Sequence, residues 1–154
     1  FSNSFTFFKN FDFSFLFDWK KGGYNSNLSN LNTDEGGTTK GWFEDENGDG
    51  IPNGRQRNPA PYNNAGRFVE DASYIKLREV GLYYTMPTAL TNSLFKNKVQ
   101  RFRMGVSGNN LMMISKYSGY DPESSTFGAG LANNVDVQPY PSARRFFLNL
   151  SLDF

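Results

Sequence analysis

The end of the chain, from Arg145 to Phe154, alternates strictly between apolar and mostly polar residues. Side chains in a β-strand point to opposite faces with a period of two residues, so this pattern predicts a strand with one wholly apolar face. That face carries Phe146, Leu148, Leu150, Leu152 and Phe154. A strand in a soluble domain has about five or six residues, whereas a strand that crosses a bilayer needs about nine to eleven, as here. The pattern therefore favours a strand that crosses a membrane.

The start of the chain repeats this alternation in two adjoining stretches. In the first stretch, Phe1, Phe5 and Phe7 share one face, and a tight turn at Lys9 and Asn10 precedes the second stretch. There the apolar face carries Phe11, Phe13, Phe15, Phe17 and Trp19, and the other face carries Asp12, Ser14, Leu16, Asp18 and Lys20. A tryptophan at a strand end is typical of the aromatic girdle of a membrane barrel. The alternative interpretation is a soluble β-sandwich with its phenylalanine face in the core.

The composition excludes several classes of function. The 154 residues carry a net charge of +1, so no basic surface indicates binding to nucleic acid. The chain has no His and no Cys, which removes imidazole and thiolate metal sites and the usual nucleophile and base pairs. Mean hydropathy is −0.59 although aromatic residues make up 17% of the chain. These properties favour alternating strands joined by polar loops, and we expect no enzymatic activity.

Short and long connections alternate along the predicted strands. A third strand is expected from about Phe68 to Met86, with a change of phase near Arg78 and Glu79, and a fourth from about Val99. The connector 88–98 between them is short and is expected to hold a helical turn, whereas segments 21–66 and 116–142 read as long loops. Membrane barrels have short periplasmic turns and long extracellular loops, so both long loops are predicted to be extracellular.

Five strands are too few to close a barrel. An open sheet edge is not tolerated in lipid, so the remaining strands must come from elsewhere. The chain begins with Phe1 rather than Met, and its opening residues already read as strand. We therefore expect the chain to be the C-terminal piece of a longer protein. The predicted fold class is all-β, an antiparallel segment of a transmembrane β-barrel over residues 1–154.

Three blocks of the sequence resemble the SusC-like TonB-dependent outer-membrane transporters. They are KNFDFSFLFDWKKGG at Lys9–Gly23, EDASYIKLREVGLYYTMP at Glu70–Pro87 and VSGNNLMMISKYSGYDPES at Val106–Ser124. The resemblance implies a barrel of about 22 strands with an N-terminal plug domain, of which this chain would supply the last five strands. One departure is Asn149, which stands where the family commonly has Gly.

The same resemblance implies a function and partners. The protein would be a multi-pass β-barrel in the lipid of the outer membrane of a Gram-negative bacterium. It would import oligosaccharides, or peptides as some members do, with a SusD-like surface lipoprotein as lid and the TonB complex acting through the missing N-terminal region. Two alternatives stay open: a TonB-dependent importer of metal chelates or cobalamin without a lid, and a soluble carbohydrate-binding β-sandwich.

Aromatic residues in the long loops are candidates for contact with substrate or lid. They are Trp42, Phe43, Tyr62, Tyr117 and Tyr120. Aromatic side chains at an exposed site with a polar rim mark interaction surfaces. The alternative for each is packing of the loops against each other. Tyr120, Asp121 and Pro122 belong to one of the family blocks, and an Asp-Pro pair by itself indicates a turn.

One loop segment has the first half of a calcium-binding pattern. Asp45, Asn47 and Asp49 alternate and precede Gly50, which permits the sharp turn of such a loop. The twelfth position holds Gln56 in place of a bidentate Glu, and no flanking helices are expected. A turn without an ion is the alternative. No other cofactor is expected.

Charged residues and the last strand complete the candidate positions. Predicted lumen-facing charges, which would pair with the plug or line a hydrated wall, are Asp12, Asp18, Lys76, Arg101, Arg103, Arg145 and Asp153. The resemblance also implies a signal for barrel assembly at Leu150, Leu152 and Phe154.

Overall fold

The computed structural model describes residues 1–57, 61–125, 127 and 134–154, with the backbone alone at 61–64. The chain divides into two compact units. The sheet unit consists of Phe1–Trp19, Ile75–Ile114 and Ala143–Phe154, and the loop unit consists of Lys20–Tyr74 and Ser115–Ser142. No helix in the described residues is both long and apolar enough to span a membrane.

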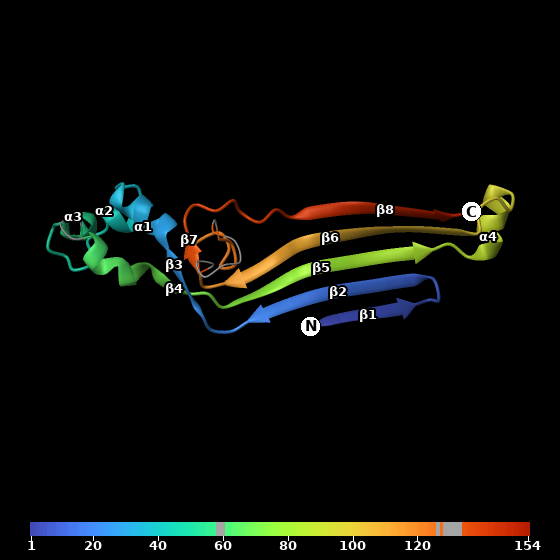
Figure 1. Cartoon of the computed structure of the whole chain (residues 1–154), viewed down its shortest axis with the longest axis horizontal. Coiled ribbons are helices and arrows are strands. Elements are labelled where there is room, and N and C mark those ends of the chain that lie inside the picture. The colour runs from blue at the N-terminus through green and yellow to red at the C-terminus, as the bar shows by residue number, and fades with distance from the viewer. Residues whose placement is uncertain (58–60, 126, 128–133) are drawn as a thin grey trace. The chain divides into compact units, whose positions relative to one another are not determined.

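The sheet unit is built from five strands that neighbour each other in chain order. They are β1 (Ser2–Phe7), β2 (Phe11–Lys20), β5 (Tyr74–Thr85), β6 (Arg101–Ser115) and β8 (Arg145–Asp153). Adjacent strands run in opposite directions, so the sheet is an antiparallel meander (Figure 1). β1 and β8 are the edge strands. The all-β fold class and the five predicted strands are confirmed, but the third strand was predicted to begin near Phe68 and begins at Tyr74. Val69–Asp71 forms a separate strand in another sheet.

One face of this sheet is apolar and exposed. Leu148, Leu150 and Leu152 of β8 lie opposite Val106, Met104 and Phe102 of β6. At the other edge, Phe5 and Phe7 lie opposite Phe13 and Phe11. Leu148 is 74% exposed and Leu150 is 64% exposed. Monomeric soluble proteins rarely expose a contiguous apolar patch of this kind, so the face needs an apolar environment.

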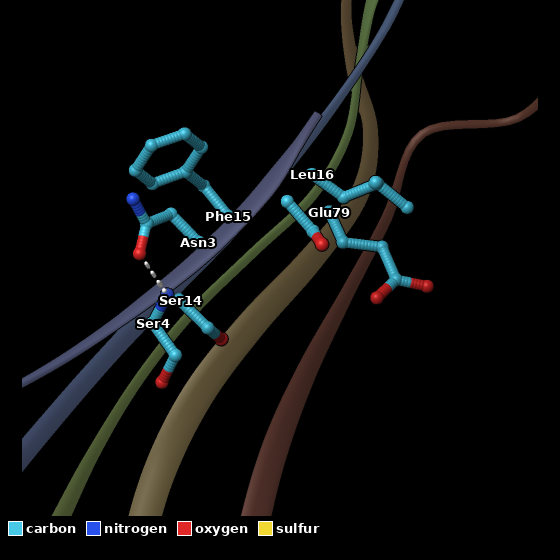
Figure 2. Close-up of a pocket in the computed structure, with 7 residues that line it drawn as sticks. Asn3, Ser4, Ser14, Phe15, Leu16 and Glu79 are labelled. Atoms are coloured by element: carbon cyan, nitrogen blue, oxygen red, sulfur yellow. Dashed lines mark hydrogen bonds between the residues drawn. The ribbon is translucent and has the colours of Figure 1, made fainter.

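Strand β5 changes phase at its centre, as its sequence pattern predicts. Arg78 donates to the carboxylate of Asp18 at 2.6 Å, which places Arg78 on the polar face. Its neighbour Glu79 points to the same side as Leu16, whereas Phe15 points to the opposite side (Figure 2). The consecutive side chains of Arg78 and Glu79 thus both lie on the polar face. The shift keeps both halves of β5 with their apolar residues on the apolar side of the sheet.

The two short connections lie at one end of the sheet (Figure 1). Phe8 and Lys9 in the β1–β2 turn have φ of 49° and 65°, in the left-handed region. The β5–β6 connector contains helix α4 (Thr88–Phe95), which ends where Lys96 takes φ of 52°. Both the tight turn and the helical turn agree with the sequence analysis.

The loop unit has regular structure that the sequence analysis did not predict. A small sheet has the order β4-β3-β7, with β3 (Tyr24–Asn27) antiparallel to β4 (Val69–Asp71) and parallel to β7 (Val135–Asp136). Its helices are α1 (Leu28–Glu35), α2 (Lys40–Phe43), α3 (Asn53–Arg57) and the 3-10 helix η1 (Pro61–Phe68).

Polar residues make up much of the interior of the loop unit. Buried apolar residues are Leu31, Phe68, Ala72, Tyr74 and Tyr117, and buried polar ones are Asn25, Asn27, Asp34, Asn53, Asp121 and Asp136. Such an interior gives no hydrophobic periodicity along the chain, which is why the segments read as loops.

Candidate functional site

A pocket of about 340 Å³ lies in the loop unit, between α1 and the segment that follows β6. Its lining residues come from chain positions far apart and are mostly hydroxyl or amide side chains: Asn27, Ser29, Asn30, Thr33, Ser118, Gly119, Tyr120 and Asp136. Tyr120 is 72% exposed and is the one aromatic residue in this lining. The pocket therefore combines hydrogen-bonding groups with an accessible ring.

Hydrogen bonds to Glu70 connect the segment after β6 to the end of β3. Both carboxylate oxygens of Glu70 accept from Ser118, one from the backbone N–H at 2.6 Å and one from the hydroxyl at 2.6 Å. The side-chain amide of Asn27 donates to the same carboxylate at 3.0 Å and to the Ser118 hydroxyl at 3.1 Å. The Asn27 oxygen in turn accepts the backbone N–H of Asn30 and caps α1. One side of the pocket is thus held in place by a closed hydrogen-bond network.

Asp136 fixes the other side of the pocket. Its carboxylate accepts the hydroxyl of Tyr117 at 2.7 Å and the hydroxyl of Ser29. Burial raises the pKa of Tyr117, and its hydrogen bond to the carboxylate of Asp136 raises it further. Tyr117 therefore stays protonated and keeps donating to the carboxylate. Because Asp136 is satisfied by these donors, the pocket presents little free charge to a ligand.

Two polar groups in the lining remain available. Within the described residues, the side-chain amide of Asn30 and the hydroxyl of Tyr120 make no hydrogen bond to the protein. An amide offers both donors and an acceptor, and the tyrosine ring offers a flat apolar surface. This arrangement suits a neutral ligand that carries many hydroxyl or amide groups.

The other predicted aromatic residues have different positions. Trp42 is half-buried, and a Cβ atom at Gly54 would overlap its ring, so Trp42 packs α2 against α3. Phe43 is 68% exposed, away from the pocket lining. Tyr117 is buried behind the lining, as described above. The side chain of Tyr62 lies outside the described residues.

A buried ion pair supports the helices that carry Trp42. Arg57 donates to both carboxylate oxygens of Asp34, at 2.8 and 3.0 Å, and to the carbonyl of Gly41 at 3.1 Å. Thr39 donates its hydroxyl to the same carboxylate. This bidentate contact connects α3 to α1. Asp34 and Arg57 are therefore structural residues, and their role was not predicted from the sequence.

The predicted calcium segment forms a tight turn. The carboxylate of Asp45 accepts the backbone N–H groups of Gly48, Asp49 and Gly50, at 2.7, 3.2 and 2.7 Å. Asp49 accepts the side-chain amides of Asn47 at 3.0 Å and Gln56 at 2.9 Å. The described residues hold no group of three or more acidic, His or Cys side chains suited to a metal. Calcium binding here stays a prediction.

Charges on the polar face of the sheet unit pair across strands. Arg103 of β6 donates to Asp12 of β2 at 2.9 Å, and its guanidinium lies 4.6 Å from the ring centroid of Tyr83. Arg101 lies opposite Asp153 in the β6–β8 register, and their side chains are 3.3 Å apart. Asp12 and Asp153, which were predicted to face the lumen, thus each have a basic partner within the sheet. Lys76 is buried, and Arg145 is exposed.

The predicted assembly residues lie on the exposed apolar face of the edge strand. Leu150 and Leu152 alternate with Asn149 and Ser151, and Phe154, after the strand, is 80% exposed. Asn149 points to the polar side, where its amide donates to the Ser107 hydroxyl at 3.0 Å. Hollows of about 430 and 400 Å³ accompany the two edge pairs, β1–β2 and β6–β8.

Comparison of the sequence with known proteins identifies several relatives, although no family model matches the chain. TonB-dependent receptor P26 of Formosa agariphila is 31% identical over 161 residues, which cover 96% of this chain and 16% of the relative. TonB-dependent receptor SusC of Bacteroides thetaiotaomicron is 32% identical over 87 residues, or 56% of this chain and 8% of SusC. The chain thus spans about a sixth, or less, of the length of these relatives.

Comparison with solved structures gives the same fold. A structure of the RagAB peptide importer in its closed-closed state matches 95% of this chain and 16% of the solved chain, with a TM-score of 0.72 and 22% identity. A structure of the RagAB peptide transporter matches with a TM-score of 0.70 and 23% identity. At this level of identity, the match concerns the fold alone.

Proposed function

The chain belongs to the SusC-like TonB-dependent receptors, and on that premise we propose that it forms part of the barrel wall of an outer-membrane nutrient importer. The observation that carries this proposal is the five-stranded sheet, with one exposed apolar face and one polar face of paired charges. Lipid satisfies the first face and a hydrated lumen satisfies the second. Further strands would pair with β1 and β8, because a sheet with open edges is not stable in lipid.

The proposal also orients the wall in the membrane. The end of the sheet with the β1–β2 turn and α4 would be periplasmic, because short turns are typical of that side. The longer connections, which contain the loop unit, would then leave the sheet on the extracellular side. An importer of this class would take its energy from TonB in the cell envelope of a Gram-negative bacterium.

We further infer that the imported substrate is a glycan and that a SusD-like lipoprotein assists its capture. SusC is among the relatives, which supports a partner of that kind. The pocket beside Tyr120 supports a neutral ligand, because its lining is rich in hydroxyls and amides and its one carboxylate is already satisfied. A sugar residue can stack on the tyrosine ring and bond to Asn30. Peptides are the alternative substrate, because the RagAB structures are those of a peptide importer.

Binding measurements on the full-length protein in detergent would test both the substrate and the site. We expect neutral oligosaccharides to bind, and Tyr120→Ala to weaken their binding about tenfold, which corresponds to about 1.4 kcal/mol. Tyr140→Ala is the matched control, because Tyr140 is 97% exposed in the same unit and does not line the pocket. Its affinity should equal that of the wild type.

Three outcomes would contradict parts of the proposal. Binding of peptides but not of oligosaccharides would show that the substrate is a peptide and not a glycan. Equal effects of Tyr120→Ala and Tyr140→Ala would remove the pocket as the binding site. A full-length protein that stays monodisperse in buffer without detergent would show that the sheet does not stand in a membrane.

A further inference from the structure

Helix α4 carries an apolar surface that the rest of the described chain leaves uncovered. Leu90 is 53% exposed and Leu94 is 65% exposed. The two residues are four positions apart, so they lie next to each other on one side of the helix. Thr91, by contrast, is fully buried, and its hydroxyl donates to the carbonyl of Pro87. The side of α4 that carries Thr91 therefore faces the rest of the protein, and the side that carries the two leucines faces away from it.

The position of α4 relative to the sheet indicates what that phase is. The ring of Phe95 at the end of α4 lies 5.8 Å, centroid to centroid, from the ring of Phe102. Phe102 lies opposite Leu152 and therefore belongs to the apolar face of the sheet. The polar face, where Arg103 bonds to Asp12, is on the other side. A plug domain would lie on the polar side, in the lumen, whereas α4 is held towards the lipid side.

The basic side chains that follow α4 complement an anionic phospholipid surface. Lys96 and Lys98 follow the helix and are both exposed, and the segment 88–98 contains no acidic residue. The β1–β2 turn lies at the same end of the sheet (Figure 1), and it contains Lys9, which is exposed. An amphipathic helix with leucines on one side and lysines beside them is typical of a segment that lies in the membrane interface. Lysine side chains reach from such a position to the lipid phosphates.

We propose that α4 is an interfacial anchor in the periplasmic leaflet of the membrane. Leu90 and Leu94 enter the acyl-chain boundary, while Lys96 and Lys98 contact the phosphate groups of anionic phospholipids. This inference rests on the proposed function, because it requires that the sheet stand in a bilayer. It adds a lipid contact at the barrel end, where the strands alone would leave the connector in water.

Site-directed spin labelling of the full-length protein tests this proposal. A nitroxide would be placed on a cysteine at Leu94, at Ala89 or at Leu150, in a protein without other cysteines, in vesicles of phosphatidylethanolamine and phosphatidylglycerol. Collisions with oxygen report apolar surroundings, and collisions with a nickel chelate report water. We expect the oxygen-to-nickel ratio at Leu94 to be several times that at Ala89 and to approach that at Leu150. Ala89 is the matched control, because it is an exposed residue on another side of the same helix.

The label at Leu150 tests the barrel proposal separately from the anchor proposal. A lipid-like ratio at Leu150 with a water-like ratio at Leu94 would overturn the anchor and leave the barrel proposal standing. A water-like ratio at Leu150 would overturn the barrel proposal itself. Low collision rates at Leu94 with both reagents would mean that protein covers the helix, which also overturns the anchor.

A charge variant tests the phosphate contact. Lys96→Gln combined with Lys98→Gln should lower the ratio at Leu94 in the vesicles that contain phosphatidylglycerol, because the helix loses its attraction to the anionic surface. The ratio at Leu150 should not change. An unchanged ratio at Leu94 would overturn the assignment of these lysines to lipid phosphates.

Discussion

Replacing Gly105 with alanine tests how side chains pack on the polar face of the sheet. A Cβ atom at this position would overlap the ring of Tyr83 on the neighbouring strand and would lie 2.7 Å from the carbonyl oxygen of Leu82. The same ring would be 2.8 Å from a Cβ atom at Gly81. Tyr83 therefore lies flat along the wall over two glycines, with Arg103 stacked on it at 4.6 Å. Such a ring covers the backbone at the two glycines, which have no side chain of their own.

The expected cost of Gly105→Ala follows from this overlap. Overpacking a well-packed site costs about 1–3 kcal/mol. The lower entropy of the unfolded chain with alanine returns about 0.4–1 kcal/mol. We therefore expect a net loss of about 1–2 kcal/mol in the free energy of unfolding. The measurement is denaturant unfolding of the full-length protein in detergent, and the midpoint should fall without a change in slope.

A double-mutant cycle with Tyr83→Ala identifies the ring as the cause. In that background the overlap with the ring is gone, and only the Leu82 oxygen still crowds the new methyl group, so the cost of Gly105→Ala should shrink. Gly41→Ala is the control, because nothing lies within 4 Å of a Cβ atom there, and it should raise stability by about 0.4–1 kcal/mol through the unfolded chain alone. An equal cost of Gly105→Ala in both backgrounds would refute the packing argument.

Four further predictions follow from the faces and loops of the chain. Leu150→Arg, on the apolar face, should lower barrel stability by about 2–4 kcal/mol, measured by unfolding in lipid, and Asn149→Arg on the polar face should cost much less; equal penalties would contradict the facing. Deleting Phe154 should lower the amount of folded protein in outer-membrane fractions while synthesis and secretion stay the same, and normal levels would argue against its role in assembly. Added calcium should protect the loop at Asp45 from proteolysis in the wild type but not in Asp45→Asn. If calcium does not change the rate of cleavage in the wild type, the prediction of a calcium site is wrong. Because the folded pKa of Tyr117 is raised, the unfolded chain alone loses this proton above pH about 10, so thermal stability should fall there in the wild type and fall less in Tyr117→Phe.

The sequence by itself determined the strands and the faces of the sheet. Alternation with a period of two residues is a local property, and it placed Leu148, Leu150 and Leu152 together on one face before any partner strand was known. The change of phase in β5 was visible for the same reason, because apolar residues before and after Arg78 follow different registers. The short helical connector and the tight turn after Phe7 were likewise predictable, since their breakers and turn residues lie within a few positions.

Only the tertiary structure decided which residues meet in the loop unit. Ser118 bonds to Glu70, 48 positions earlier, and Ser29 bonds to Asp136, 107 positions later. Neither contact has a signal in the sequence, because polar residues without periodicity do not reveal their partners. The side of the sheet on which α4 lies was also undetermined until Phe95 was seen against Phe102. Hydrophobic alternation can be recognised from residues that are neighbours in the sequence. Hydrogen-bond networks and ring contacts, by contrast, depend on chain segments that only folding brings together.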